Sequence, residues 1–338
     1  MTTDVVALAR RLVDIPSVTG EEDDVARFVA ALLVDLGYQV EVFEAAPGRP
    51  NVLATTARSP QVVLSTHLDT VPPYIAARVA DGALCGRGAC DAKGIVAAQV
   101  AAAERLRAEG LEELGLLFLV DEEVGSLGAR SANAHPRARE CRWLINGEPT
   151  DNRLATASKG SLRLTLHTDG VSAHSAYPEH GRSAIDALID VLSDLRRTSW
   201  PSDPVLGDTT LNVGVIAGGT RPNVVPAEAR AELQIRLVSD AAAIERQVER
   251  TVAGRARVEL LSAVNPVRLA TVPGFETCVV RFTTDIPNLT HWGTPLPVGP
   301  GSILEAHSEH ERIDLTELAA GADGYVRLVR ALLRGPES

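Results

Sequence analysis

Cysteine is scarce in this sequence. Its 338 residues include four cysteines, at positions 85, 90, 141 and 278, and none of them forms a Cys-X-X-Cys pair. A set this small and scattered excludes a disulfide framework. The first residues carry neither a basic segment nor a long apolar stretch. We therefore expect a protein of the reducing cytoplasm that is neither secreted nor inserted in a membrane.

Lysine is almost absent as well. Lys93 and Lys159 are the only two lysines, and the chain carries a formal net charge of −11 at pH 7. This acidic balance argues against nucleic acid or an anionic membrane as a general partner, although it leaves local sites open. Apolar side chains are plentiful, at 45% of the residues. A chain of this length and content predicts two domains with large cores.

Three apolar segments in the first half predict buried strands, and polar residues follow directly where each strand ends. Residues 61–64 lead into Ser65-Thr66-His67-Leu68-Asp69, residues 114–120 into Asp121-Glu122-Glu123, and residues 143–145 into Asn146-Gly147-Glu148. A helix predicted over residues 92–107 begins directly after Asp91. In an α/β sheet the carboxyl ends of the strands meet at one crevice, which predicts that these side chains lie together.

Carboxylates gathered in one crevice repel each other unless cations compensate their charge, so this pattern indicates a metal site. His67 and Asp69 support that interpretation, because residues two apart in an extended segment point to the same side. A carboxylate placed in this way can fix the tautomer of a metal-binding histidine. The alternative, for any one of these residues, is an ordinary solvated acid in a loop.

Shorter patterns predict the other helices, strands and loops in the first part of the chain. Helices are predicted over residues 4–13 and after Thr19-Gly20-Glu21-Glu22, whose spacing matches a capping box. Alternation predicts strands over residues 38–42 and 51–54. The glycine-rich residues 82–88 are expected to form a loop.

The middle of the chain has a different character. Apolar and polar residues alternate strictly over 161–167, which predicts a strand. The patterns that follow predict a helix over 183–197, strands over 211–216 and 229–237, a helix over 240–254 and a strand over 257–260. This β-α-β-β-α-β order is that of a ferredoxin-like module. It is expected to be an insertion, because helix and loop return after Asn265 and a last helix covers residues 315–333. We therefore expect a catalytic domain from residues 1–156 and 263–338, interrupted by an inserted domain over residues 157–262.

Seven motifs, taken in order, resemble those of the acetylornithine deacetylase, succinyl-diaminopimelate desuccinylase, aminoacylase and carboxypeptidase-G family of two-zinc hydrolases. The resemblance covers nearly the whole chain, and it implies a three-layer α/β zinc-peptidase-like catalytic domain with an inserted α+β lid and dimerisation domain. The motifs are His67-Leu68-Asp69, residues 86–94, Asp121-Glu122-Glu123, Gly147-Glu148-Pro149-Thr150, Ala173-His174-Ser175-Ala176, residues 221–226, and His307 with Glu311.

The resemblance implies two Zn²⁺ ions, which Co²⁺ or Mn²⁺ can replace. Asp91 would bridge the ions, His67 and Glu148 would bind one of them, and Glu123 and His307 the other. His310 is a second candidate for the last position, and His307 is preferred because it stands four residues before Glu311. The peptide bond between Asp91 and Ala92 is expected to be cis, as in relatives.

The same resemblance assigns catalytic roles. Asp69 would orient His67, Glu122 would act as the general base, and His174 of the inserted domain would donate a hydrogen bond to the oxyanion, in some relatives from a neighbouring subunit. The substrate's carboxylate would be held by Arg236, Asn223 and Ser302. We expect a homodimer that hydrolyses the amide bond of an N-acyl amino acid, in the manner of an acetylornithine deacetylase.

Alternatives remain open within and outside this chemistry. A carboxypeptidase or dipeptidase, a desuccinylase and a carrier-protein lysine hydrolase would use the same metal site, because motifs do not define the acyl pocket. A non-catalytic relative could use the cleft to bind amino acids or peptides, although the full ligand set and Glu122 argue against it. A nucleotide-binding protein is disfavoured, because residues 82–88 match neither the P-loop nor the dinucleotide fingerprint.

Overall fold

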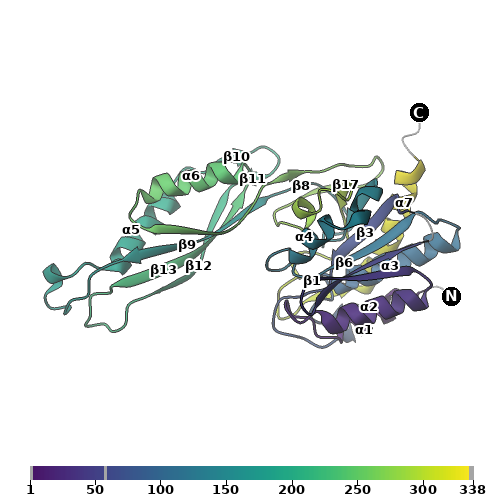
Figure 1. The fold of residues 1–338 in the computed structure, drawn as a ribbon, viewed down its shortest axis with the longest axis horizontal. Coiled ribbons are helices and arrows are strands. Elements are labelled where there is room, and N and C mark those ends of the chain that lie inside the picture. The colour runs from purple at the N-terminus through teal and green to yellow at the C-terminus, as the bar shows by residue number, and fades with distance from the viewer. Residues whose placement is uncertain (1–2, 57–58, 335–338) are drawn as a thin grey trace. The chain divides into compact units, whose positions relative to one another are not determined.

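A computed structural model describes residues 3–56 and 59–334, and the chain divides into two compact units (Figure 1). The first unit comprises Met1–Thr156, Leu269–Cys278 and Thr284–Ser338. The second comprises Ala157–Arg268 and Val279–Thr283. The second unit therefore extends beyond the expected boundary at residue 262. The reason is that strand β14 continues to Val264, and β15 (Val267–Arg268) then pairs with Ala157 and Ser158.

The first unit is built on a six-stranded sheet in the order β1-β2-β6-β3-β7-β17. Strands β6, β3, β7 and β17 run parallel, whereas β1 and β2 pair antiparallel at one edge. The predicted apolar segments form the central strands, and β3 and β6 are buried along their whole length. The bounds are β1 Gln39–Ala46, β2 Arg49–Thr55, β3 Val62–His67, β6 Leu114–Leu119, β7 Trp143–Asn146 and β17 Thr294–Pro297.

Helices cover both faces of this sheet, which confirms the predicted three-layer α/β arrangement (Figure 1). One face of the sheet, toward which Leu64 and Leu116 point, packs against four helices. They are α1 (Val5–Val13), α2 (Asp23–Asp35), α3 (Lys93–Ala108) and α7 (Leu315–Arg334). Helix α4 (Leu127–Asn133) packs with Trp292 on the other face, where Val63 and Leu117 point. Alternation along each strand thus divides its apolar side chains between two cores.

Two local predictions were wrong, because in both places the residues bond to a segment that is distant in the sequence. Residues 83–85 form strand β5 (Ala83–Cys85), which pairs with β4 (Arg78–Ala80) and with β18 (Arg312–Asp314) near the other end of the chain. Thr19 does not cap helix α2. Its hydroxyl donates instead to the Asp69 carboxylate at 2.8 Å, and the residue at the N-cap position is Glu22.

The second unit confirms the predicted ferredoxin-like insert. Its antiparallel sheet has the order β12-β13-β9-β14, and helices α5 and α6 pack on the face that presents the leucines of β9. The elements are β9 Gly160–Asp169, α5 Ala184–Arg197, β12 Thr210–Gly218, β13 Glu228–Leu237, α6 Ala241–Val252 and β14 Arg257–Val264. A small hairpin, β10 (Ser202–Asp203) and β11 (Gly207–Asp208), follows α5.

The remaining elements are short. They are β8 (Leu154–Ser158), β16 (Thr277–Val280) and three 3-10 helices, η1 (Pro136–Glu140), η2 (Pro178–His180) and η3 (Ile286–Asn288). Within the described ranges, none of the helices combines the length and the apolar character that crossing a bilayer requires.

Candidate metal centre

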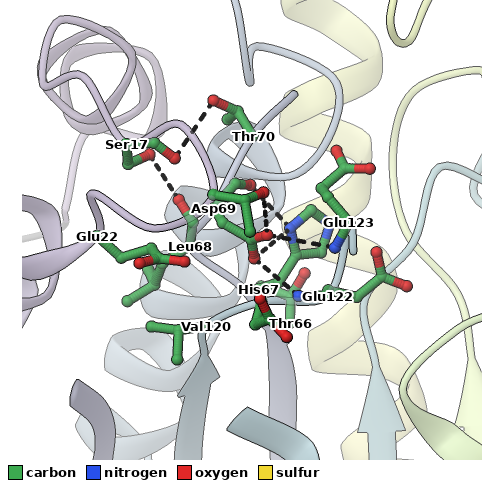
Figure 2. Close-up of polar contacts among 12 residues, drawn as sticks. Ser17, Glu22, Thr66, His67, Leu68, Asp69, Thr70, Val120, Glu122 and Glu123 are labelled. Carbon is green, nitrogen blue, oxygen red and sulfur yellow. Dashed lines mark hydrogen bonds and ion pairs between the residues drawn. The ribbon is translucent and has the colours of Figure 1, made fainter. Parts of the chain in front are cut away.

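The side chain of Asp69 fixes the loops that surround the ends of strands β3 and β6 (Figure 2). Its carboxylate accepts hydrogen bonds from the Thr19 hydroxyl at 2.8 Å, from the Glu122 N–H at 3.0 Å and from the Glu123 N–H at 3.2 Å. Although burial opposes ionisation, the contact with His67 and these donors hold the pKa of Asp69 below its ordinary value. The Asp69 carboxylate therefore positions the backbone of two neighbouring glutamates.

His67 is held so that one ring nitrogen faces the crevice. Its Nδ1 lies 2.9 Å from the carbonyl oxygen of Asp69 and 3.6 Å from the nearer carboxylate oxygen. The carbonyl, and not the carboxylate that the sequence suggested, is thus the hydrogen-bond acceptor for Nδ1–H. This arrangement leaves Nε2 available as a ligand, and that atom lies 2.9 Å from Asp91 Oδ1.

Asp91 lies between two histidines. Its Oδ1 contacts His67, and its Oδ2 lies 3.5 Å from Nε2 of His307, which in turn lies 3.0 Å from Glu123 Oε1. The Asp91–Ala92 peptide bond is cis, as expected. Hydrogen bonds to Asp91 and Glu123 raise the pKa of His307 to about 10. His307, and not the exposed His310, therefore contacts this acidic pair.

Glu148 follows the end of β7 and is buried, and its Oε1 has no hydrogen-bond partner among the residues that the structure describes. Burial, and then the charge of Asp91, raises the pKa of Glu148 well above its ordinary value. Burial likewise raises the pKa of Glu122 and of Glu123. The Glu148 oxygen without a partner lies in a cluster with three more acids and two imidazoles. Such a cluster fits a site for divalent cations, whose positive charge would compensate the negative charge of the acids. His67, Asp91 and Glu123 already place one ligand atom each within 4.8 Å of one another.

Glu311 binds the backbone of the loop that carries Asp91, a role that sequence reasoning did not assign. Its buried carboxylate accepts the N–H groups of Gly88, Cys90 and Asp91 at 2.9, 3.2 and 3.1 Å. The same carboxylate pairs with Arg87 Nη1 at 2.6 Å. The only sequence signal was its place four residues after His307, which indicates a motif but no partner.

The other predicted site residues belong to both units. His174 and Asn223 belong to the second unit, where both are exposed and the Ser175 N–H donates to the Asn223 carbonyl at 3.0 Å. Arg236 is on β13 of the same unit, with Nη1 at 3.4 Å from the Thr283 hydroxyl. Ser302 belongs to the first unit, and its carbonyl accepts from Cys90 Sγ at 3.3 Å.

Comparison with known proteins identifies the family of this chain. Residues 156–259 match the model of the peptidase dimerisation domain, and residues 51–181 match that of peptidase family M28. A peptidase M20 domain-containing protein from Schizosaccharomyces pombe is 35% identical over 98% of this chain and 85% of its own length. A probable carboxypeptidase from Aspergillus terreus is 38% identical over 96% of this chain and 85% of its own length. The chain therefore belongs to the M20 family of metallopeptidases, and it is a hydrolase.

A solved structure shares the fold of both units. The M20 family metallo-carboxypeptidase from Sulfolobus solfataricus superposes with a TM-score of 0.79, covering 97% of this chain and 99% of its own, at 16% sequence identity. This likeness supports the arrangement of a catalytic α/β unit with an inserted dimerisation domain.

Proposed function

We propose that this enzyme is a metal-dependent carboxypeptidase of short peptides, which cleaves the amide bond beside a free α-carboxylate. The observation that carries the proposal is the position of Asp91 between His67 and His307, with Glu123 and Glu148 beside it. The similarity to relatives named probable carboxypeptidases supports a peptide as the substrate of this chain. An N-acyl amino acid, such as N-acetylornithine, presents the same amide and the same carboxylate and is the second candidate substrate class.

The contacts among His67, Asp91, Glu123 and His307 support the proposed ligand set. Asp91 would bridge two ions, His67 and Glu148 would complete one site, and Glu123 and His307 the other. Nitrogen and oxygen donors of this kind suit Zn²⁺ and accept Co²⁺ or Mn²⁺. When bound, the pair of cations would supply Lewis acidity and lower the pKa of water toward neutrality.

Glu122 is proposed as the general base. Its backbone is fixed through the Asp69 carboxylate. Burial, and then the charge of Glu148, raises the pKa of its carboxyl, and a raised pKa suits a group that must both accept and return a proton near neutral pH. Glu122 would take the proton of the attacking water and deliver it to the departing amine nitrogen.

Residues of the second unit are proposed to recognise the substrate. Arg236 offers a guanidinium that matches a carboxylate bidentately, and Asn223 offers an amide. Ser302 is proposed for the same carboxylate. His174 is proposed as a hydrogen-bond donor to the oxyanion, and the match to the peptidase dimerisation domain supports a homodimer.

The proposal is tested on purified protein supplied with Zn²⁺, Co²⁺ or Mn²⁺. The substrates are an N-blocked dipeptide, the same dipeptide amidated at its C-terminus, and N-acetylornithine, and release of the amine is measured. We expect cleavage of the free-acid dipeptide, little cleavage of the amidated one, and loss of activity in a chelator. Cleavage of N-acetylornithine alone would identify a deacetylase instead. Failure with every substrate, in protein that holds metal, would favour a binding module.

Metal content gives an independent measurement. Elemental analysis of gently purified protein should approach two equivalents of metal, and His307→Ala should lower this content because it removes a ligand of one ion. His310→Ala is the matched control, since this exposed neighbour is not in the proposed set. Full metal content in His307→Ala would overturn the assignment of that site.

A further inference from the structure

Arg49 is the first residue of β2 and belongs to none of the motifs of the site. Its side chain is only 18% exposed and bonds to two acids from distant segments. Nε donates to Glu22 Oε2 at 2.9 Å, and Nη2 donates to the other oxygen of the same carboxylate. Nη1 lies 2.8 Å from Asp121 Oδ1. One guanidinium therefore joins the start of α2 to the segment that follows β6.

Asp121 stands directly before Glu122 and begins the turn of residues 121–126. Its φ is +70°, a left-handed conformation that residues other than glycine seldom adopt and that the surrounding bonds must hold. Its carbonyl accepts the Gly125 N–H at 3.0 Å, and its Oδ2 accepts the Leu127 N–H at 3.1 Å. These bonds close the turn, and the remaining carboxylate oxygen of Asp121 is the one that Arg49 binds.

Glu22 fixes the direction of the Arg49 guanidinium. The Glu22 side chain is fully buried, and its Oε1 also accepts the Gly20 N–H at 3.0 Å. Because a guanidinium is planar, two bonds to one carboxylate determine where its third nitrogen points, and here that nitrogen faces Asp121. The Asp69 carboxylate separately accepts the Glu122 N–H. The backbone that presents Glu122 is thus held at residue 122 by Asp69 and at residue 121 by Arg49.

We infer that Arg49 is a positioning residue, which holds Asp121 in its left-handed conformation and thereby keeps the Glu122 carboxylate in its working position. The inference rests on the proposed role of Glu122 as general base. Arg49 touches neither substrate nor reacting atoms in this account, and its effect is transmitted through Asp121. The alternative is an ion network that stabilises the first unit and has no effect on the chemistry.

Arg107 offers a matched control for this alternative. It is also a partly buried arginine of the first unit, and its Nη1 donates to Glu104 Oε1 and to the Leu36 carbonyl, both at 2.8 Å. Leu36 is the C-cap of α2, whereas Glu22 is its N-cap, so the two arginines hold opposite ends of one helix. Of the two, Arg49 is the one with a bond to the turn of residues 121–126 in the part of the chain that the structure describes.

The test compares Arg49→Met, Arg49→Lys and Arg107→Met as metal-loaded enzymes. For Arg49→Met we expect kcat to fall about 10- to 100-fold, with KM and metal content close to those of the wild type. Arg49→Lys should have an intermediate kcat, because an ammonium can still bond to Asp121 but cannot hold both acids in one plane. Arg107→Met should lower the melting temperature, as Arg49→Met does, and leave kcat unchanged.

Asp121→Asn tests the transmission. Its single carbonyl oxygen can accept from Arg49 or from the Leu127 N–H, whereas the carboxylate accepts from both, so kcat should fall in the same direction. The double variant with Arg49→Met should be no slower than the slower single variant, because both changes break one contact. Losses that multiply in the double variant would show that Arg49 does not act through Asp121.

Wild-type kcat in folded Arg49→Met, or a kcat that falls only in step with lost metal, would overturn the inference. If Arg49→Met does not fold, Asp121→Asn decides alone, because it leaves the Arg49–Glu22 pair in place, and wild-type kcat there would overturn the inference. Turnover retained in Glu122→Gln would refute the proposed base and this inference with it. An inactive Glu122→Gln beside a fully active Arg49→Met would contradict this inference only.

Discussion

The Asp91 N–H donates to the Glu311 carboxylate at 3.1 Å, across 220 positions of the sequence. Glu311 thereby joins two motifs, because it accepts from the loop that carries Asp91 and stands four residues after His307. One buried carboxylate thus links the loop that carries Asp91 to the segment that carries His307.

Replacing Glu311 should weaken both the fold and the metal site. Glu311→Ala leaves the Arg87 guanidinium buried without its partner, and breaking a buried pair in this way costs about 3–5 kcal/mol. Metal affinity should fall about 10- to 100-fold, because the Asp91 loop loses its acceptor. Thermal unfolding and metal titration measure the two effects. Glu309→Ala, at an exposed neighbour, should change neither, and wild-type affinity in Glu311→Ala would refute the supporting role.

Glu122→Gln should keep the fold and the metal but lose turnover. An amide cannot accept the proton of the attacking water, and loss of a general base costs about 10²–10⁴ in rate. Steady-state kinetics and elemental analysis on the same preparation separate the two properties. Glu21→Gln, which changes an exposed glutamate, is the matched control. Activity within a few-fold of wild type in Glu122→Gln would require a different base.

Asp69→Asn should lower kcat with little loss of fold. The amide nitrogen of asparagine would face one of the donors that Asp69 now accepts, Thr19 Oγ1 or the N–H of Glu122 or Glu123, and the turn would shift. We expect a fall of about 10- to 100-fold in kcat, measured beside the melting temperature. The exposed Asp35→Asn should behave as wild type. A collapse in stability without a specific effect on kcat would show Asp69 to be purely structural.

The metal-free protein should lose stability as pH rises. Glu122, Glu123 and Glu148 have raised pKa values in the folded state, so above the unfolded pKa of about 4.3 the folded protein retains protons that the unfolded chain has released. His307 acts in the same direction, because its stabilisation is complete below its ordinary pKa of 6.5 and is lost as pH rises toward about 10. The lowered pKa values of Asp69 and Asp91 contribute stability that is already complete above about pH 5.

Melting curves in a chelator between about pH 6 and about pH 9 should therefore show a falling melting temperature. Saturating metal should reduce this slope, since cations replace the protons that compensate the acids. A metal-free protein whose melting temperature rises over this range would contradict the electrostatic account of the centre.

Two inactive variants should complement each other if the protein is a dimer whose His174 serves the neighbouring subunit. His174→Ala should cost about 10²–10³ in rate, as loss of one oxyanion donor does. Mixed with Glu122→Gln under conditions of subunit exchange, it should recover part of the activity. His180→Ala, at an exposed histidine of the same segment, should remain active alone. No recovery in mixed dimers, or an active monomer in sedimentation, would show that His174 acts within its own chain or not at all.

Most of the fold was predictable because its signals are local. The continuous apolar residues of β3, β6 and β7 predict strands buried on both faces, and the alternation of β9 predicts a different kind of sheet. Since β6, β3 and β7 are parallel neighbours, the polar residues after them meet, as the sequence predicted for His67, the Asp121–Glu123 run and Glu148.

The sequence by itself determined which elements form, which of their ends carry acids and histidines, and which family these motifs resemble. The tertiary structure decided which strands pair and which side chains form hydrogen bonds with each other. It paired β5 with β18, directed the Thr19 hydroxyl to Asp69 instead of a helix end, and placed the Glu311 carboxylate against the N–H of Asp91. Helix and strand preferences are set by neighbours along the chain, whereas the acceptor of a buried hydrogen bond is set by whichever segments the packing of the core brings together.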